Sequence, residues 1–187
     1  GTPRVALASR MAVLDYESIE RFPPGMEVAV PEIGQCERFE RPVLHVRLRT
    51  RKGTEIQVLV VHLKSKRPKF IGILKGTHTP LLVVGDLNDS PESVTSQLIA
   101  ATSDIAFDRS ARDVALWHAP DVQTGQALRH DVGYSHIHQG SPEVLDQIWV
   151  SEEFVADSRF AIGDVRRVDY FNDHLNEGHD RVRSDHG

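Results

Sequence analysis

The chain has 187 residues, the length of one domain, and its 40% hydrophobic residues match the composition of ordinary globular proteins. A formal net charge of −5 excludes a protein that binds nucleic acid mainly through an overall positive charge. It does not exclude a locally basic binding groove. The single cysteine, Cys36, excludes an internal disulfide. The longest apolar runs, Val58–Val61 and Leu81–Val84, are too short to span a bilayer.

Most regular segments of the first half read as strands. A short apolar run predicts a strand at Val5–Ser9. Residues Val43–Arg49 alternate between apolar and polar side chains, which predicts a strand with one buried face. After a turn at 51–54, the apolar stretch Ile56–Leu63 returns, so the two segments predict a hairpin.

The second half adds a buried strand, one helix and two further strands. Leu81–Val84 ends at Gly85-Asp86 and is typical of a central strand buried on both faces. Ser90 as N-cap and Pro91 at the first position predict a helix. Its apolar stripe would be Val94, Leu98, Ile99 and Ala101. Strands are predicted at 144–150 and Phe160–Val168, and this content predicts an α/β or α+β sandwich.

Polar side chains gather where the buried strands end. They occupy four segments, residues 61–66, 85–89, 145–148 and 184–186. As candidates for chemistry these include two histidines (His62, His186), three carboxylates (Asp86, Asp146, Asp185) and an amide (Asn88). Magnesium-assisted cleavage of a phosphodiester needs hard oxygen ligands, a group that orients water and a group that protonates the leaving oxygen. The inventory therefore fits such a hydrolase.

Each segment alone has a simpler interpretation. His62 in an apolar strand is by itself more often a hydrogen-bonded core histidine. The run Asp86–Asp89 resembles the start of a calcium loop, but Pro91 and Gln97 stand where the turn glycine and the bidentate glutamate must be. A lone aspartate at a strand end, such as Asp146, is usually a turn or cap residue.

Taken together and in order, the four segments resemble the endonuclease/exonuclease/phosphatase superfamily. The motifs on which the resemblance rests are His-Leu, Gly-Asp-x-Asn, Leu-Asp-x-Ile-x-Val-Ser and a late Ser-Asp-His. The resemblance extends from about Val5 to the C-terminus. It implies a single domain over 1–187 with a DNase I-like two-sheet α/β sandwich, incomplete at the N-terminus and lacking the last strand. Relatives include deoxyribonucleases, abasic-site endonucleases, neutral sphingomyelinases and inositol polyphosphate 5-phosphatases.

The resemblance also implies roles for the first three site residues. His62 would contact the scissile phosphate and help protonate the leaving group. Asp86 would orient or deprotonate the attacking water, and Asn88 would hold that water and a phosphate oxygen.

Three later residues complete the implied site. Asp185 would supply a carboxylate to the metal ion, and His186 would bind phosphate and stabilise the transition state. Asp146 would accept a hydrogen bond from His186 and fix its tautomer. The implied cofactor is Mg²⁺ or Mn²⁺, with Asp86, Asn88 and Asp185 as metal ligands.

The sequence departs from the superfamily pattern in two places. An early asparagine and the glutamate of a Gln-Glu pair, the principal metal ligand in the superfamily, have no match, and we expect them upstream of Gly1. The segment between Lys64 and Pro80 is a poor helix for a parallel crossover, which predicts omitted residues near 70–76. A non-catalytic phosphate-binding module that has lost the first metal ligand therefore stays open.

Several residues are candidates for substrate contact. Lys64 and Lys66 follow His62 and would hold a polyanion, whereas Arg47–Lys52 fits a solvated strand face and turn. His136 would line the substrate groove, and a zinc site with His138 is the weaker alternative. The expected substrate is a phosphodiester, nucleic acid first, with phospholipid and inositol phosphate left open. Oligomeric state and cellular location are not indicated.

Overall fold

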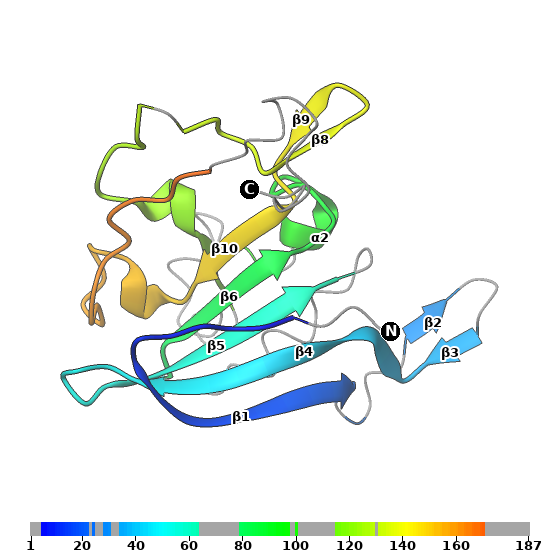
Figure 1. The fold of residues 1–187 in the computed structure, drawn as a ribbon, viewed down its shortest axis with the longest axis horizontal. Helices are drawn as coiled ribbons and strands as arrows, with labels where there is room; N and C mark the ends of the chain where they lie inside the picture. The colour runs from blue at the N-terminus through cyan, green and yellow to red at the C-terminus, as the bar shows by residue number, and fades with distance from the viewer. Residues whose placement is uncertain are drawn as a thin grey trace.

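The computed structural model describes residues 5–22, 24, 28–30, 34–63, 79–97, 100, 115–129 and 131–170 of the chain. A mixed six-stranded sheet crosses this part of the molecule, with two small hairpins beside it (Figure 1). In spatial order the large sheet contains β1 (Ala12–Arg21), β4 (Arg38–Arg49), β5 (Glu55–His62), β6 (Leu81–Asp86), β10 (Asp146–Val150) and β7 (Trp117–His118). The hairpins are β2 (Val28–Val30) with β3 (Gly34–Cys36), and β8 (His136–His138) with β9 (Ser141–Glu143). The helical elements are α2 (Val94–Gln97) and the 3-10 turns η2 (Ala119–Val122) and η3 (Glu152–Phe154).

The predicted hairpin is confirmed. Strands β4 and β5 pair antiparallel from Leu44 opposite Val60 to Arg49 opposite Glu55. The connecting turn closes with a backbone hydrogen bond of 3.0 Å from Gly53 N–H to the Thr50 carbonyl, and Gly53 has a φ of 86°, which a residue without a Cβ adopts readily. Beyond it, β6 runs parallel to β5 and antiparallel to β10.

Two apolar clusters cover the two faces of the sheet. The first contains Val43, Leu59, Val61, Leu63, Leu81, Val83, Leu87, Leu116 and Trp149. The second contains Val46, Leu48, Ile56, Val58 and Val60. β6 is an inner strand, as predicted, but Leu81 and Val83 are fully buried while Leu82 and Val84 are only half-buried. At β6, the face with the first cluster is therefore the better covered one among the described residues.

Two predicted strands are wrong. Residues 5–9 pair with none of the described strands, and most of their side chains are exposed. The segment Phe160–Val168 is also irregular, since it begins inside a turn in which Ala161 N–H donates to the Ser158 carbonyl. Its later part is extended and receives backbone hydrogen bonds from Thr124 and Gly125 without joining the sheet.

The predicted helix starts later than expected. Ser90 accepts a hydrogen bond from Ser93 N–H through its carbonyl, so Ser90 and Pro91 belong to a turn. Ser93 is the true N-cap, because its Oγ accepts the Ser96 N–H at 3.1 Å. The side chains of the predicted stripe at Val94, Leu98, Ile99 and Ala101 lie outside the described residues, as does the crossover segment 64–78. No helix in the described part of the chain is long and apolar enough to cross a bilayer.

Candidate active site

A row of polar side chains crosses three neighbouring strands of the large sheet. In the parallel pair β5–β6, His62 is opposite Asp86, and in the antiparallel pair β6–β10, Asp86 is opposite Asp146. Paired residues of adjacent strands point to the same face. The sheet thus brings together three of the residues that the sequence selected, with Asp86 in the middle.

The histidine and the central aspartate are in direct contact. His62 Nε2 lies 3.1 Å from Asp86 Oδ2, and the His62 side chain is 32% exposed while that of Asp86 is 11% exposed. A carboxylate only accepts hydrogen bonds, so the Nε2 proton lies between the two groups. The pair is half-buried at one end of the sheet, where solvent and a ligand still reach the imidazole.

Gly85 allows β6 to approach β5 immediately before this pair. Its φ is 129°, and a Cβ at this position would lie 2.1 Å from the carbonyl oxygen of Val61. Any side chain here would force the strands apart, because carbon and oxygen cannot approach so closely. The glycine of the Gly-Asp-x-Asn motif therefore keeps Asp86 beside His62.

Asn88 lies in the turn after β6, where it donates hydrogen bonds to Asp86 and to the backbone of Leu63. Its backbone has a φ of 52°, in the left-handed region that asparagine tolerates better than most residues. Its N–H donates to Asp86 Oδ1 at 2.7 Å, and its Nδ2 donates to the Leu63 carbonyl at 2.7 Å. Since Nδ2 is bound to backbone, the amide oxygen is the atom of Asn88 suited to a water or a cation.

Asp146 is positioned through its backbone by a residue that the sequence analysis missed. Ser135 is fully buried, and its Oγ accepts the N–H groups of Leu145 and Asp146 at 3.0 and 2.9 Å. The N–H of Ser135 in turn donates to the Glu143 carbonyl. This bridge ties the β8–β9 hairpin to the start of β10. The sequence signal for Ser135 was only its place directly before His136.

Gln147, on the opposite face of β10, connects this strand to the loop after β6 through side-chain hydrogen bonds. Its Nε2 donates to the Asp89 carbonyl at 2.5 Å, and its Oε1 accepts the indole N–H of Trp149 at 2.7 Å. Gln147 and Trp149 are each 1% exposed. Gln147 thus connects the loop after β6 to β10, and the buried Trp149 packs in the core.

The hairpin brings His136 toward the same end of β10. His136 directly follows Ser135 and is opposite Glu143 in the β8–β9 pair, half-buried. The remaining predicted site residues, Lys64, Lys66, Asp185 and His186, lie outside the described residues.

The donor atoms fit a hard divalent cation in type. Asp86 and Asn88 offer carboxylate and amide oxygens, and Asp89 Oδ2 is buried without a hydrogen-bond partner in the part of the chain that the structure describes. Within that same part, no three His, Cys, Asp or Glu residues form a group able to hold a metal ion. A complete site needs a further donor, and Asp185 is the candidate from the sequence.

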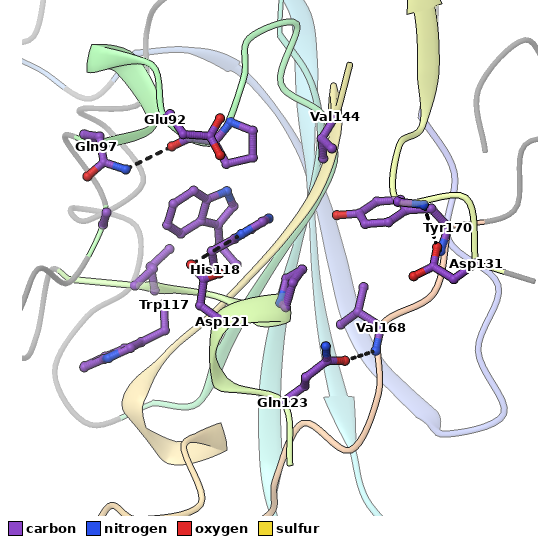
Figure 2. Close-up of a pocket in the computed structure, with 16 residues that line it drawn as sticks. Glu92, Gln97, Trp117, His118, Asp121, Gln123, Asp131, Val144, Val168 and Tyr170 are labelled. Carbon is purple, nitrogen blue, oxygen red and sulfur yellow. Dashed lines mark hydrogen bonds and ion pairs between the residues drawn. The ribbon is translucent and has the colours of Figure 1, made fainter. Parts of the chain in front are cut away.

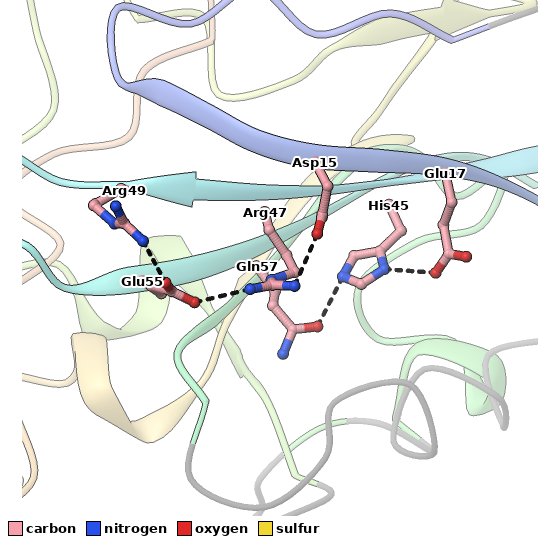
Figure 3. A network of polar contacts seen from close by, with 7 residues as sticks. All are labelled: Asp15, Glu17, His45, Arg47, Arg49, Glu55 and Gln57. Atoms are coloured by element: carbon pink, nitrogen blue, oxygen red, sulfur yellow. Dashed lines mark hydrogen bonds and ion pairs between the residues drawn. The ribbon is translucent and has the colours of Figure 1, made fainter.

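A second polar cluster lies on the other side of the same sheet (Figure 3). It consists of Asp15, Glu17, His45, Arg47, Arg49, Glu55 and Gln57 from β1, β4 and β5. Its ion pairs include Arg47 with Asp15 at 2.8 Å and Arg49 with Glu55 at 2.9 Å. The interpretation of Arg47 and Arg49 as part of a solvated strand face agrees with their side-chain exposures of 43% and 51%.

Comparisons with known proteins agree on the fold. No curated protein matches the chain. The endonuclease/exonuclease/phosphatase protein of Bacteroides vulgatus shares 15% identity at a TM-score of 0.51, with 76% of this chain and 55% of that one covered. The catalytic domain of human Nocturnin shares 17% identity at a TM-score of 0.45, with 77% and 49% covered. The chain therefore spans about half the length of these structures.

The sequence profile of the Endonuclease/Exonuclease/phosphatase family matches residues 4–186. The mixed sheet with few helices is the DNase I-like fold, as the resemblance implied. This superfamily includes metal-dependent phosphodiesterases and phosphatases. The chain belongs to the endonuclease/exonuclease/phosphatase family.

Proposed function

We propose that this chain carries the catalytic residues of a metal-dependent phosphodiester hydrolase that acts in the manner of a nuclease. The observation that supports this most is the row of His62, Asp86 and Asp146 on one face of the sheet, with Asn88 bound to Asp86. Three separate strands bring proton-transferring and acceptor groups to one place, which packing alone does not require.

Asp86 is suited to orient the attacking water. One of its oxygens accepts a hydrogen bond from His62 and the other accepts one from Asn88 N–H. A carboxylate has about four acceptor sites in all, so capacity remains for a water molecule. Because both contacts hold the carboxylate in one orientation, a water bound to it would be aimed at the phosphorus in line with the leaving oxygen.

His62 is suited to proton transfer. Its contact with Asp86 fixes the ring, and its exposed part can reach a phosphate oxygen or the leaving group. We assign to Asp146 the task of orienting His186, which would stabilise charge on the phosphate in the transition state.

A divalent cation, Mg²⁺ or Mn²⁺, would be held by Asp86, Asn88 and Asp185 and would supply positive charge near the developing phosphorane oxygens. Lys64, Lys66 and His136 would contact the substrate beside the row. Nucleic acid is the proposed substrate, and phospholipid or inositol phosphate are the alternatives that a substrate series would separate.

One observation favours a different function, a phosphate-binding module without turnover. Both oxygens of Asp86 already have protein partners, and the described residues contain no group of three metal-binding side chains. Such a module would bind a phosphodiester through its imidazole and amide groups and release it unchanged.

Hydrolysis of bis(4-nitrophenyl) phosphate with Mg²⁺, with Mn²⁺ and with EDTA distinguishes the two functions. The hydrolase predicts turnover that EDTA abolishes, that is lost in His62→Asn and that is kept in the control His45→Asn, whose histidine lies in the second polar cluster. Binding without turnover under both metals would support the module instead.

A further inference from the structure

A cavity of about 480 Å³ lies beside the outer edge of β10 (Figure 2). Strand β7 pairs only with Trp149 and Val150, and the chain then turns away into η2. Residues of β7 and η2 line the cavity, and Trp149 is the lining residue that β10 contributes. Trp149 lines it from one face of the sheet, and Val168 and Tyr170 line it from the other.

The charged side chains among the described residues that line the cavity are acidic. Glu92, Asp121 and Asp131 contribute carboxyl groups, and no lysine or arginine is present among the described lining residues. A carboxylate-lined recess repels phosphate and attracts cations. The cavity therefore has the opposite preference to the site proposed for a phosphodiester.

Aromatic rings form a large share of the walls. Both Trp117 and Trp149 line the cavity, together with the rings of His118 and Tyr170. His118 packs against Trp149 with ring centroids 5.1 Å apart. Indole faces attract organic cations through their negative electrostatic potential, and they also accept alkyl chains.

Two buried polar atoms on the walls have no hydrogen-bond partner among the described residues, His118 Nε2 and the Tyr170 hydroxyl. Figure 2 shows the two side chains on opposite sides of the cavity, with the hydroxyl directed toward the His118 side. His118 Nδ1 lies 3.6 Å from Asp121 Oδ2, which favours the tautomer with the proton on Nδ1.

Both groups can therefore act as acceptors. Burial lowers the pKa of His118, so the ring is neutral at pH 7, and Nε2 then carries a lone pair. Burial, together with nearby carboxylates such as Asp131 and Asp146, raises the pKa of Tyr170 to about 12, so its hydroxyl stays protonated and can accept a hydrogen bond. A ligand that donates N–H bonds would satisfy both atoms, which are costly to leave unpaired when buried.

We propose that this cavity binds a protonated alkylamine, with the ammonium group among the acidic side chains, His118 and Tyr170, and the alkyl chain against Trp117 and Trp149. The ammonium supplies the positive charge that complements the carboxylates of the lining. It also supplies N–H donors for His118 Nε2 and the Tyr170 hydroxyl. The described lining residues do not include His62, Asp86 or Asp146, although Asp146 lies near Tyr170. Binding of the amine requires neither hydrolysis nor a metal.

Tryptophan fluorescence tests the proposal directly, because the chain has two tryptophans and both line the cavity. We would titrate the protein with butylammonium chloride at constant ionic strength, in the presence of EDTA, and compare it with 1-butanol and inorganic phosphate. The proposal predicts a saturable change in emission with butylammonium alone. An equal response to butanol would overturn it, since the cavity would then select only an alkyl chain.

Variants identify the groups responsible. Glu92→Gln and Asp121→Asn should each weaken butylammonium binding about twofold to fivefold, and Tyr170→Phe about fivefold to tenfold. The matched control Asp157→Asn removes an exposed carboxylate that does not line the cavity and should leave binding unchanged. If the three cavity variants all bind as the parent does, the proposal is wrong. Circular dichroism during thermal unfolding checks that each variant is folded.

Discussion

The two polar clusters of the large sheet lie on opposite faces and differ in how their groups are used. In the cluster on β1, β4 and β5, arginine and histidine side chains contact carboxylates or an amide oxygen, and the ion-paired side chains of Asp15, Arg47 and Glu55 are 42% to 55% exposed. In the row on β5, β6 and β10, Asp86 is 11% exposed and its partners are one imidazole and one backbone N–H.

The difference shows which polar groups of a sheet are available for chemistry. The arginines and carboxylates of the first cluster neutralise one another in water, where such pairs contribute little. In the row, the nearly buried carboxylate of Asp86 contacts the His62 imidazole and the Asn88 N–H. It thus keeps the ability to bind a water or a cation, and the predictions below test this contrast.

The largest effect is expected for Asp86→Asn. If Asp86 orients the attacking water, the amide should lower kcat by about 10²- to 10⁴-fold, the range usual for removal of a general base. The fold should remain cooperative because the amide keeps the size of the side chain. Steady-state hydrolysis of bis(4-nitrophenyl) phosphate measures it, and near-normal turnover would show that the row is not the site.

Gly85→Ala tests the geometry that holds the row together. The left-handed φ of 129° alone should cost about 1–3 kcal/mol, and the 2.1 Å approach of the new Cβ to the Val61 carbonyl adds to this. We expect a lower midpoint in urea unfolding and a loss of activity. Gly53→Ala is the matched control, since its Cβ would meet nothing within 4 Å and the strain there is that of φ alone.

Ser135→Ala should have an intermediate effect. It leaves the N–H groups of Leu145 and Asp146 without their shared acceptor, which should reduce the free energy of unfolding by about 1–3 kcal/mol. Activity should fall as well, because Asp146 loses its support. Ser135→Thr keeps the hydroxyl, so retained stability in Thr and loss in Ala would identify the hydrogen bonds as the cause.

The smallest effect is expected for Glu55→Gln in the exposed cluster. Hydrogen bonds from Arg49 and Arg47 lower the pKa of Glu55 from its ordinary 4.5, so its contribution to stability is present above pH 4.5 and is lost as the pH falls below it. Turnover should equal that of the parent protein. Thermal unfolding at pH 7 and pH 3 should show a small difference that disappears in acid; an activity loss would contradict the contrast between the two clusters.

Much of the central sheet could be predicted because its strands are half or fully buried. The alternation of Val43–Arg49 and the apolar run Ile56–Leu63 reflect burial directly, so the hairpin followed from the pattern. Strand β1 could not be found this way, since it lies at the end of the sheet and its side chains are mostly exposed on both faces. Without a buried face, the sequence shows no period of two.

The candidate site likewise contains residues that could be selected from the sequence and one that could not. His62, Asp86 and Asp146 could be selected because the four segments, taken together and in order, resemble the superfamily, although each residue alone has a simpler interpretation. Ser135 could not, because its role depends on a contact with residues about ten positions along the chain, which no local pattern records.

The position of β1 has a consequence for the behaviour of the protein at high concentration. Among the described strands, β1 has a neighbour on one side only, and such a ten-residue edge strand is a template for strand pairing with a second copy. Val13 and Tyr16 on it are 53% and 75% exposed. Asp15 and Glu17, interspersed with them, place like charges where two such strands would meet. The double substitution Asp15→Asn with Glu17→Gln should increase light scattering on concentration, so carboxylates without a catalytic task would still determine colloidal stability.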